Sequence, residues 1–116
     1  MNSKNYIINE LGVLIKMFSN VRVRYEYNEY TLTHIIEVVP HDVYYFNNEY
    51  ILWESKLFDK FIDLYPTENI CFITDDALVG IKKEIYNKEG LNYTAFYKQQ
   101  ENTIYDPNQF MFREKK

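Results

Sequence analysis

Residues 21–39 read VRVRYEYNEYTLTHIIEVV; apolar side chains alternate with charged ones along the first half, and every second residue of the second half falls on one face: Leu32, His34, Ile36 and Val38. A period of two is typical of a strand that buries one face, so the two halves predict a β-hairpin. We expect a four-residue turn at 28–31 to join the strands. Pro40 follows, and because proline has no amide hydrogen to give to a ladder, the second strand should end there.

The expected turn fixes which residues face one another across the hairpin. It predicts four pairs on the apolar face: Tyr27 with Leu32, Tyr25 with His34, Val23 with Ile36, and Val21 with Val38. A slip of one residue would turn one apolar set outward. On the opposite face the same register places Arg22 beside Glu37, and this charge pair favours a four-residue turn over a two-residue turn.

An amphipathic helix is predicted before the hairpin, over residues 3–18. Its apolar residues recur at spacings of four, three and four, which places them along one face: Ile7, Leu11, Leu14 and Phe18. Ser3 is the expected N-cap. Gly12 lowers the stability of this helix by about 1 kcal/mol relative to alanine, and a close approach by another backbone would explain its presence.

Residues 43–65 admit two interpretations. In one, Asn47 or Asn48 caps a long helix that ends at Tyr65, just before a proline. In the other, the two asparagines form a tight turn between short strands, and the helix starts only near Ser55. The first interpretation gives a core stripe that a carboxylate interrupts: Tyr50, Glu54, Leu57, Phe61 and Leu64.

The remaining residues predict shorter elements. The apolar run 70–74 should be a buried strand that reaches the hairpin through a crossover. Asp75-Asp76 would cap a short helix at 77–81. Residues 87–90 would form a turn, and alternation over 91–97 predicts a last strand.

Together these elements predict an α+β domain of two layers, in which amphipathic helices pack on a mixed or antiparallel sheet of roughly three to five strands. The chain has 116 residues, which suits a single domain. We assign that domain to residues 1–98. Residues 99–116 are expected to be a polar C-terminal extension, partly flexible or docked.

Composition and charge limit the compartments and the classes of partner that we expect for this protein. The net charge is −4, and phosphate binding depends on clustered lysine and arginine, so neither nucleic acid nor a membrane surface is an expected partner. No apolar run approaches the roughly 18 residues of a membrane span, and the N-terminus does not resemble a signal peptide. The one cysteine, Cys71, lies in an apolar run and should be buried. We therefore expect a soluble cytoplasmic protein.

Four residues are candidates for chemistry or metal binding. Glu54 and His34 are the candidate catalytic residues, because a buried carboxylate and a histidine can exchange protons with a substrate. Asp75 and Asp76 follow a strand end, where two carboxylates suit a hard cation. Each also has a structural interpretation: His34 as a neutral core residue, Glu54 as a helix-margin residue that reaches water, and the aspartates as helix caps. The sequence contains no glycine-rich phosphate loop and no GxSxG, CxxC or HExxH motif.

Without a catalytic constellation, the sequence favours a protein-interaction module, of a binding, inhibitory or scaffold kind, with no catalytic activity and no cofactor. Its expected partner is another protein or a second copy of this chain. Aromatic side chains bury much area with few rotors, so the predicted binding surface is aromatic: Tyr27, Tyr30, Tyr44, Tyr45 and Trp53. The alternative is a small metal-dependent hydrolase that uses clustered carboxylates.

Overall fold

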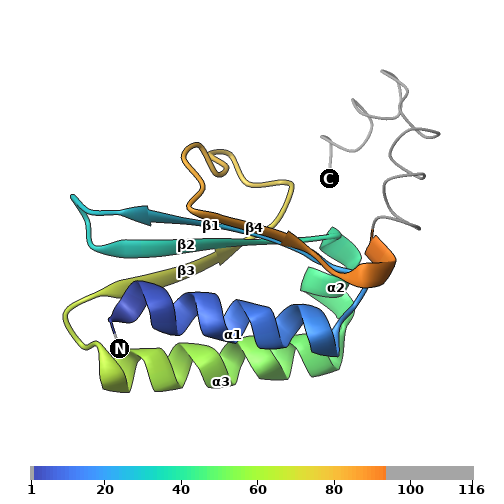
Figure 1. Ribbon diagram of the computed structural model, residues 1–116, viewed down its shortest axis with the longest axis horizontal. Helices are drawn as coiled ribbons and strands as arrows, with labels where there is room; N and C mark the ends of the chain where they lie inside the picture. The colour runs from blue at the N-terminus through green and yellow to red at the C-terminus, as the bar shows by residue number, and fades with distance from the viewer. Residues whose placement is uncertain (1, 94–116) are drawn as a thin grey trace.

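The computed structural model describes residues 2–93. Its elements follow one another as α1 (Ser3–Met17), β1 (Arg22–Asn28), β2 (Thr33–Val39), α2 (His41–Phe46), α3 (Asn48–Leu64), β3 (Asn69–Ile73) and β4 (Tyr86–Glu89). The strands form one four-stranded sheet in the order β3-β2-β1-β4, and α1 and α3 lie against one of its faces (Figure 1). The predicted α+β class, with helices packed on a mixed sheet, is confirmed.

The hairpin of β1 and β2 forms, but its register differs from the predicted one by two residues. Val23 lies opposite Val38, and Tyr25 lies opposite Ile36. A shift of two keeps every side chain on its predicted face, because side chains alternate with a period of two. Val23 and Ile36 are accordingly both fully buried.

A turn one residue later than predicted explains the new register. It occupies residues 29–32, between the paired Asn28 and Thr33. The Asn28 side chain accepts hydrogen bonds from the amides of Tyr30 and Thr31, which is how asparagine commonly starts a turn. Leu32 completes the turn with a left-handed φ of 54°.

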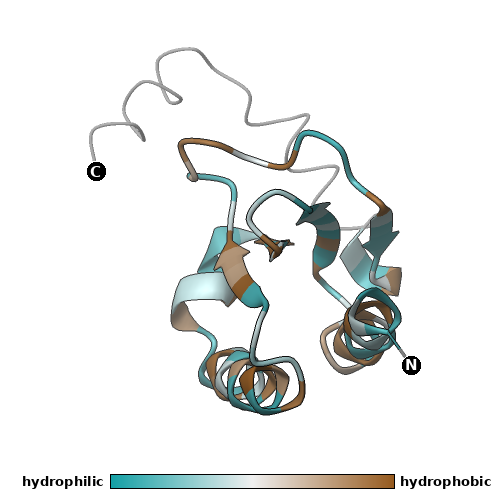
Figure 2. Ribbon diagram, turned by 90° about the vertical axis from the view of Figure 1, so that its left-hand side faces the viewer, coloured by the Kyte–Doolittle hydropathy of each residue, from teal (hydrophilic) through white to brown (hydrophobic). Residues whose placement is uncertain are grey.

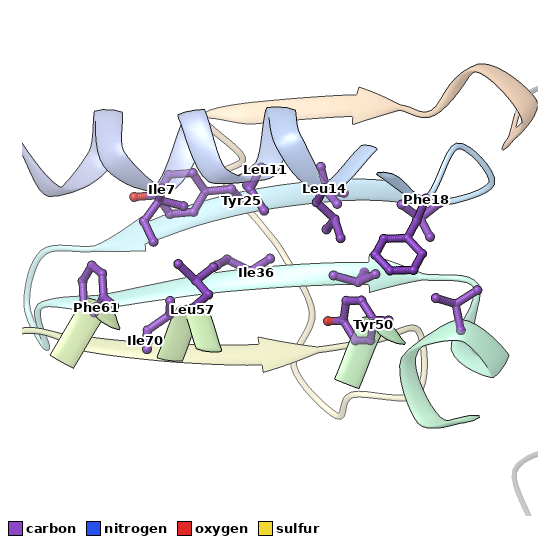
Figure 3. Packing of buried hydrophobic residues seen from close by; sticks show 14 residues of the cluster. Ile7, Leu11, Leu14, Phe18, Tyr25, Ile36, Tyr50, Leu57, Phe61 and Ile70 are labelled. Carbon is purple, nitrogen blue, oxygen red and sulfur yellow. The ribbon is translucent and has the colours of Figure 1, made fainter. Parts of the chain in front are cut away.

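One core fills the space between the sheet and the two long helices. Figure 2 looks along α1 and α3 and shows them beside each other under the sheet. The predicted stripe of α1 is buried as expected, and it meets residues of the hairpin, α3 and β3 (Figure 3). Asn2 caps α1 in place of Ser3, because the Asn2 side chain accepts a hydrogen bond of 2.8 Å from the Asn5 amide.

The long-helix interpretation of residues 43–65 is confirmed. The Asn47 side chain accepts a hydrogen bond of 3.0 Å from the Tyr50 amide and so caps α3. The residues before Asn47 form the separate short helix α2, which was not predicted. Together α2 and α3 make the expected crossover, since β3 pairs in parallel with β2.

The connection after β3 departs from the prediction. Residues 75–85 are irregular, and the predicted helix at 77–81 does not form. Strand β4 lies where a turn was expected, because it pairs with the free edge of β1, with Tyr86 opposite Tyr25. This pairing joins residues far apart in sequence, which local patterns do not report.

Gly90 follows β4, and its backbone lies beside that of Ser19, in the connection between α1 and β1. A Cβ atom at Gly90 would lie 2.2 Å from the carbonyl oxygen of Ser19, so only glycine fits. Residues 91–93 are helical, where the start of a strand at 91–97 was predicted. The rest of that strand and the extension at 99–116 lie outside the described residues.

Strand β3 carries Cys71 on the side of the sheet away from the helices. Its neighbours Ile70 and Phe72 face the core, and the strand alternation turns Cys71 outward, so the predicted burial of this cysteine is wrong. Within residues 2–93, none of the helices combines the length and the apolar character that crossing a membrane requires.

Candidate functional site

The candidate histidine His34 is fully buried on the inner face of β2. Its Nε2 lies 2.6 Å from a carboxylate oxygen of Glu68, and its Nδ1 is hydrogen-bonded to the Tyr25 hydroxyl. A carboxylate only accepts, so Nε2 donates to Glu68 and Nδ1 accepts from Tyr25. The rings of Tyr27 and Phe61 enclose the imidazole, with centroids 4.5 Å and 5.1 Å away.

This environment keeps His34 neutral. Burial lowers the pKa of His34 below its ordinary value, although the nearby Glu68 carboxylate opposes the shift. Burial alone would raise the pKa of Glu68, but hydrogen bonds from His34 and Ser3 outweigh it and lower that pKa. With both ring nitrogens engaged, His34 has no free nitrogen to offer a substrate.

The candidate carboxylate Glu54 lies near the start of α3, beside a group of tyrosines. It accepts a hydrogen bond of 2.8 Å from the Tyr50 hydroxyl. Burial raises the pKa of Glu54, although this bond opposes the shift. Burial and the Glu54 charge raise the pKa of Tyr44 to about 12, and the Tyr44 hydroxyl donates to the Phe72 carbonyl at 2.7 Å.

The structure does not bring the two candidate catalytic residues together. His34 packs against Phe61, which follows Glu54 on α3 by seven residues. Seven residues correspond to about 10 Å along a helix axis. Glu54 and His34 therefore have different polar partners, and neither can pass a proton directly to the other.

Asp75 and Asp76 follow β3 after Thr74, and α2 provides partners for both. The Nδ1 atom of His41 lies 3.5 Å from an Asp75 oxygen, and the Tyr45 hydroxyl donates to Asp76 at 2.7 Å. The hydrogen bond to Asp76 raises the pKa of Tyr45, with burial adding to the shift. Across residues 2–93, no three histidine, cysteine, aspartate or glutamate side chains gather so that they could hold a metal ion. The aspartates tie the chain after β3 to α2, and they do not cap a helix.

The predicted aromatic surface is divided between two ends of the sheet. Tyr27 and Tyr30 lie at the hairpin end, whereas Tyr44 and Tyr45 belong to α2 at the opposite end (Figure 1). Tyr30 is 93% exposed, but Tyr27 is partly covered. Trp53 packs edge-on against Phe72, with ring centroids 6.4 Å apart. These five aromatic residues therefore do not form one continuous surface.

A different set of apolar side chains is exposed along the two long helices. Val13 and Met17 of α1 are 47% and 58% exposed, and Ile51 and Phe58 of α3 are 41% and 44% exposed. We call these four residues the α1/α3 face. They are in addition to the buried stripes by which both helices contact the sheet.

Helical spacing and ring contacts place these residues on facing sides of α1 and α3. The Tyr6 ring lies 5.9 Å from the Tyr65 ring across the two helices. Val13 and Met17 follow Tyr6 by seven and eleven residues, so they continue the same side of α1. Ile51 and Phe58 precede Tyr65 by fourteen and seven residues, and they continue the corresponding side of α3. The α1/α3 face is thus a row of apolar groups along the seam between the helices.

The sequence holds a signal for this face outside the core stripe of the first helix. The first helix has apolar residues outside its core stripe, among them Tyr6, Val13 and Met17. A helix that contacts only a sheet needs one apolar face. The additional apolar row indicates a second contact. Tyr6 makes part of it, with the rings of Phe61 and Tyr65. We expect the exposed Val13 and Met17 to make the rest.

Comparisons of the chain with protein-family models, with curated proteins and with solved structures found no match.

Proposed function

We propose that this protein is a protein-interaction module without catalytic activity, and that it binds its partner through the α1/α3 face. The observation that carries the proposal is the exposure of four apolar side chains, Val13, Met17, Ile51 and Phe58, along one helix seam. Isolated apolar residues on a surface need no explanation, but a contiguous row from two elements is typical of a contact site.

The arrangement of the face supports binding energetically. Partly buried side chains that pack against the core flank the exposed row, among them Tyr6, Ile62 and Tyr65. A partner that covers Val13 and Phe58 would complete the burial of groups that are already held in position. Such preorganised apolar groups lose little conformational entropy on binding.

The environment of the polar candidates supports a role without catalysis. His34 and Glu54 are separate and each is engaged with tyrosines, and Asp75 and Asp76 are bonded to α2. A general acid or base needs to reach the reacting atom, and a metal-dependent hydrolase needs converging ligands. The observations give no specific support for the hydrolase alternative.

Site-specific photo-cross-linking tests the proposal. A benzoyl-phenylalanine at Phe58 of the full chain, in the cells that make it, should give a defined protein adduct. The same label at Tyr30 is the matched control, because Tyr30 is an exposed aromatic residue at the hairpin end. The adduct at Phe58 should disappear when Met17→Asp is added. Absence of an adduct, or equal labelling from both positions, would overturn the proposal.

A further inference from the structure

We infer that the free edge of β3 takes up an extended segment of another protein, in which apolar and acidic side chains alternate. The segment would extend the four-stranded sheet beyond β3, which Figure 2 shows above α3. This surface differs from the α1/α3 face, so the inference stands independently of the proposed function. It is carried by the unpaired backbone of β3, by the composition of that strand, and by two lysines of α3.

The backbone of β3 offers hydrogen-bonding groups on the side away from β2. Strand β3 pairs in parallel with β2, and the Asn69 amide donates to the Leu32 carbonyl at 2.8 Å. Alternate residues of a strand bond the same neighbour, so Ile70 and Phe72 direct their amides and carbonyls outward. In the part of the chain that the structure describes, the Tyr44 hydroxyl bonds one of these groups, the Phe72 carbonyl, at 2.7 Å. Both groups of Ile70 and the Phe72 amide remain for a further strand.

The composition of β3 lacks the features that usually protect a sheet edge. Edge strands commonly carry charged residues or proline, which discourage pairing with other chains. Strand β3 reads NICFI and has neither, whereas β4, at the opposite edge, reads YNKE. On the outer face of β3, Cys71 is exposed and Ile73 is partly buried. Side chains of an added strand that point to this face would therefore meet apolar neighbours.

Two lysines of α3 lie below the place of the added strand. The Trp53 ring contacts the Phe72 ring, with centroids 6.4 Å apart, and this contact marks the side of α3 that lies under β3. Lys56 and Lys60 follow Trp53 by three and seven residues, so they continue this side. Both lysines are exposed, and within residues 2–93 neither forms an ion pair. Glu49 shares this side, but at the α2 end. Acidic side chains on the inner face of an added strand would pair with the two lysines.

The lysines also favour a different protein over a second copy as the occupant. Two copies paired through their own β3 strands about a two-fold axis would bring four lysines to one side of the joint sheet, where like charges repel. A segment with alternating apolar and acidic side chains fits both faces of the edge. Main-chain bonds to Ile70 and Phe72 would supply affinity, and the alternating side chains would supply specificity.

Titration of the full chain with the peptide VEVEVEV tests the inference. The fluorescence of Trp53, the one tryptophan of the chain, should change and give a dissociation constant of about 10–500 μM. Amide hydrogen exchange should slow at Ile70 and Phe72, but not at Asn87 on the opposite edge of the sheet. A fully N-methylated VEVEVEV should not bind because it has no amide donors, and VKVKVKV should not bind because the lysines repel it.

A matched pair of variants tests the role of the lysines. Lys60→Glu should raise the dissociation constant of VEVEVEV about fivefold or more. Lys16→Glu makes the same change at an exposed lysine of α1 and should alter this constant by less than about twofold. Equal effects of the two substitutions would contradict the inference, because they would show only a response to the net charge of the chain.

Other results would also overturn the inference. Failure of VEVEVEV to bind at about 1 mM does so, as does binding that survives N-methylation. Slow exchange at Ile70 and Phe72 without peptide would show that the edge is already occupied. Dependence of that exchange on protein concentration would identify a second copy there, and independence a segment of the same chain. The cross-link at Phe58 tests a different surface, so its result does not decide this one.

Discussion

Buried ionisable groups in this protein join elements that are distant in the sequence. On the inner side of the sheet, His34 connects β2 to Glu68 ahead of β3. On the outer side, Glu37 is 5% exposed and accepts hydrogen bonds from Arg22 at 3.2 Å and Arg24 at 2.7 Å. Removing one partner of such a group leaves the other buried and unpaired, which costs more than the bond itself contributes.

The environment of His34 predicts a loss of stability in acid. The folded state holds the pKa of His34 below its ordinary value, so the unfolded chain takes up this proton first as the pH falls. The free energy of unfolding should therefore decline below about pH 6.5. His34→Gln should lower the free energy of unfolding by about 1–3 kcal/mol at about pH 8. Between about pH 7.5 and pH 5, the free energy of unfolding should fall less in this variant than in the wild type. Urea unfolding measures both slopes, and equal slopes would contradict the prediction.

Glu54 should show the opposite dependence on pH. Its folded-state pKa is raised by burial, so the folded chain takes up this proton before the unfolded chain does, and the charged carboxylate is unfavourable at neutral pH. Glu54→Gln should raise the free energy of unfolding at pH 7 by about 1 kcal/mol or less. The gain should shrink as the pH falls towards 4.5, the ordinary pKa of a glutamate. If Glu54→Gln destabilised the protein equally at pH 7 and pH 4.5, the result would show that the hydrogen bond from the Tyr50 hydroxyl needs the carboxylate.

At the scale of elements, two glycines should respond to the same substitution with opposite signs. Gly12→Ala should stabilise the monomer by about 1 kcal/mol, because the site is open and alanine favours the helix. Gly90→Ala should destabilise it by about 1–3 kcal/mol, because the new methyl group would overlap the backbone of Ser19. Denaturant unfolding at a protein concentration where the chain is monomeric compares the two. Equal effects would mean that the surroundings of these glycines differ from those described.

The elements that sequence patterns predict well are those with their own periodicity. Helices α1 and α3 and the hairpin each carry an apolar stripe or alternation, and they formed where expected. The hairpin register was wrong by two residues because the Asn28 side chain, and not the strand pattern, sets the turn. Strand β4 was missed because its residues, Tyr86–Glu89, lack alternation and depend on pairing with β1.

The candidate site was predicted less well than the fold. His34 was expected opposite Tyr25 on the apolar face, and it is buried there with a hydrogen bond to that residue, although it now lies opposite Tyr27 in the register. Its bond to Glu68 depends on the crossover, which the sequence pattern did not resolve. The α1/α3 face was missed because Val13 and Met17 lie off the stripe that defines the helix. A second apolar row becomes visible only once the neighbouring helix is in place.

At the scale of the whole molecule, polar contacts hold the end of the connection from β3 to β4 against the outer face of the sheet, and the Glu26 carboxylate makes two of them. Glu26 accepts hydrogen bonds from the amides of Lys82 and Lys83, at 2.7 Å and 3.1 Å, and these bonds lower its pKa despite burial. Arg24 adds an ion pair with Glu84 at 3.6 Å. These polar contacts position the connection, which has no apolar core of its own.

Glu26→Ala should therefore release this connection while leaving the core intact. Trypsin cleavage after Lys82 and Lys83 should become several-fold faster, because the loss of one or two hydrogen bonds makes local opening of this segment easier. The thermal midpoint should change little. Glu29→Ala, at an exposed acid of the hairpin turn, is the matched control and should not change the cleavage rate. Unchanged cleavage in Glu26→Ala would show that other contacts hold the connection.

The order in which the strands leave the ribosome follows from the sheet topology. The central pair, β1 and β2, is translated early, whereas its two outer neighbours come from the second half of the chain. Until Tyr86–Glu89 has been synthesised, β1 presents an open row of amides and carbonyls to the solvent or to any nascent chain nearby. The late arrival of β4 is thus the step that shields the growing polypeptide from edge-to-edge aggregation, and slowed synthesis before codon 86 should lower its yield in native form.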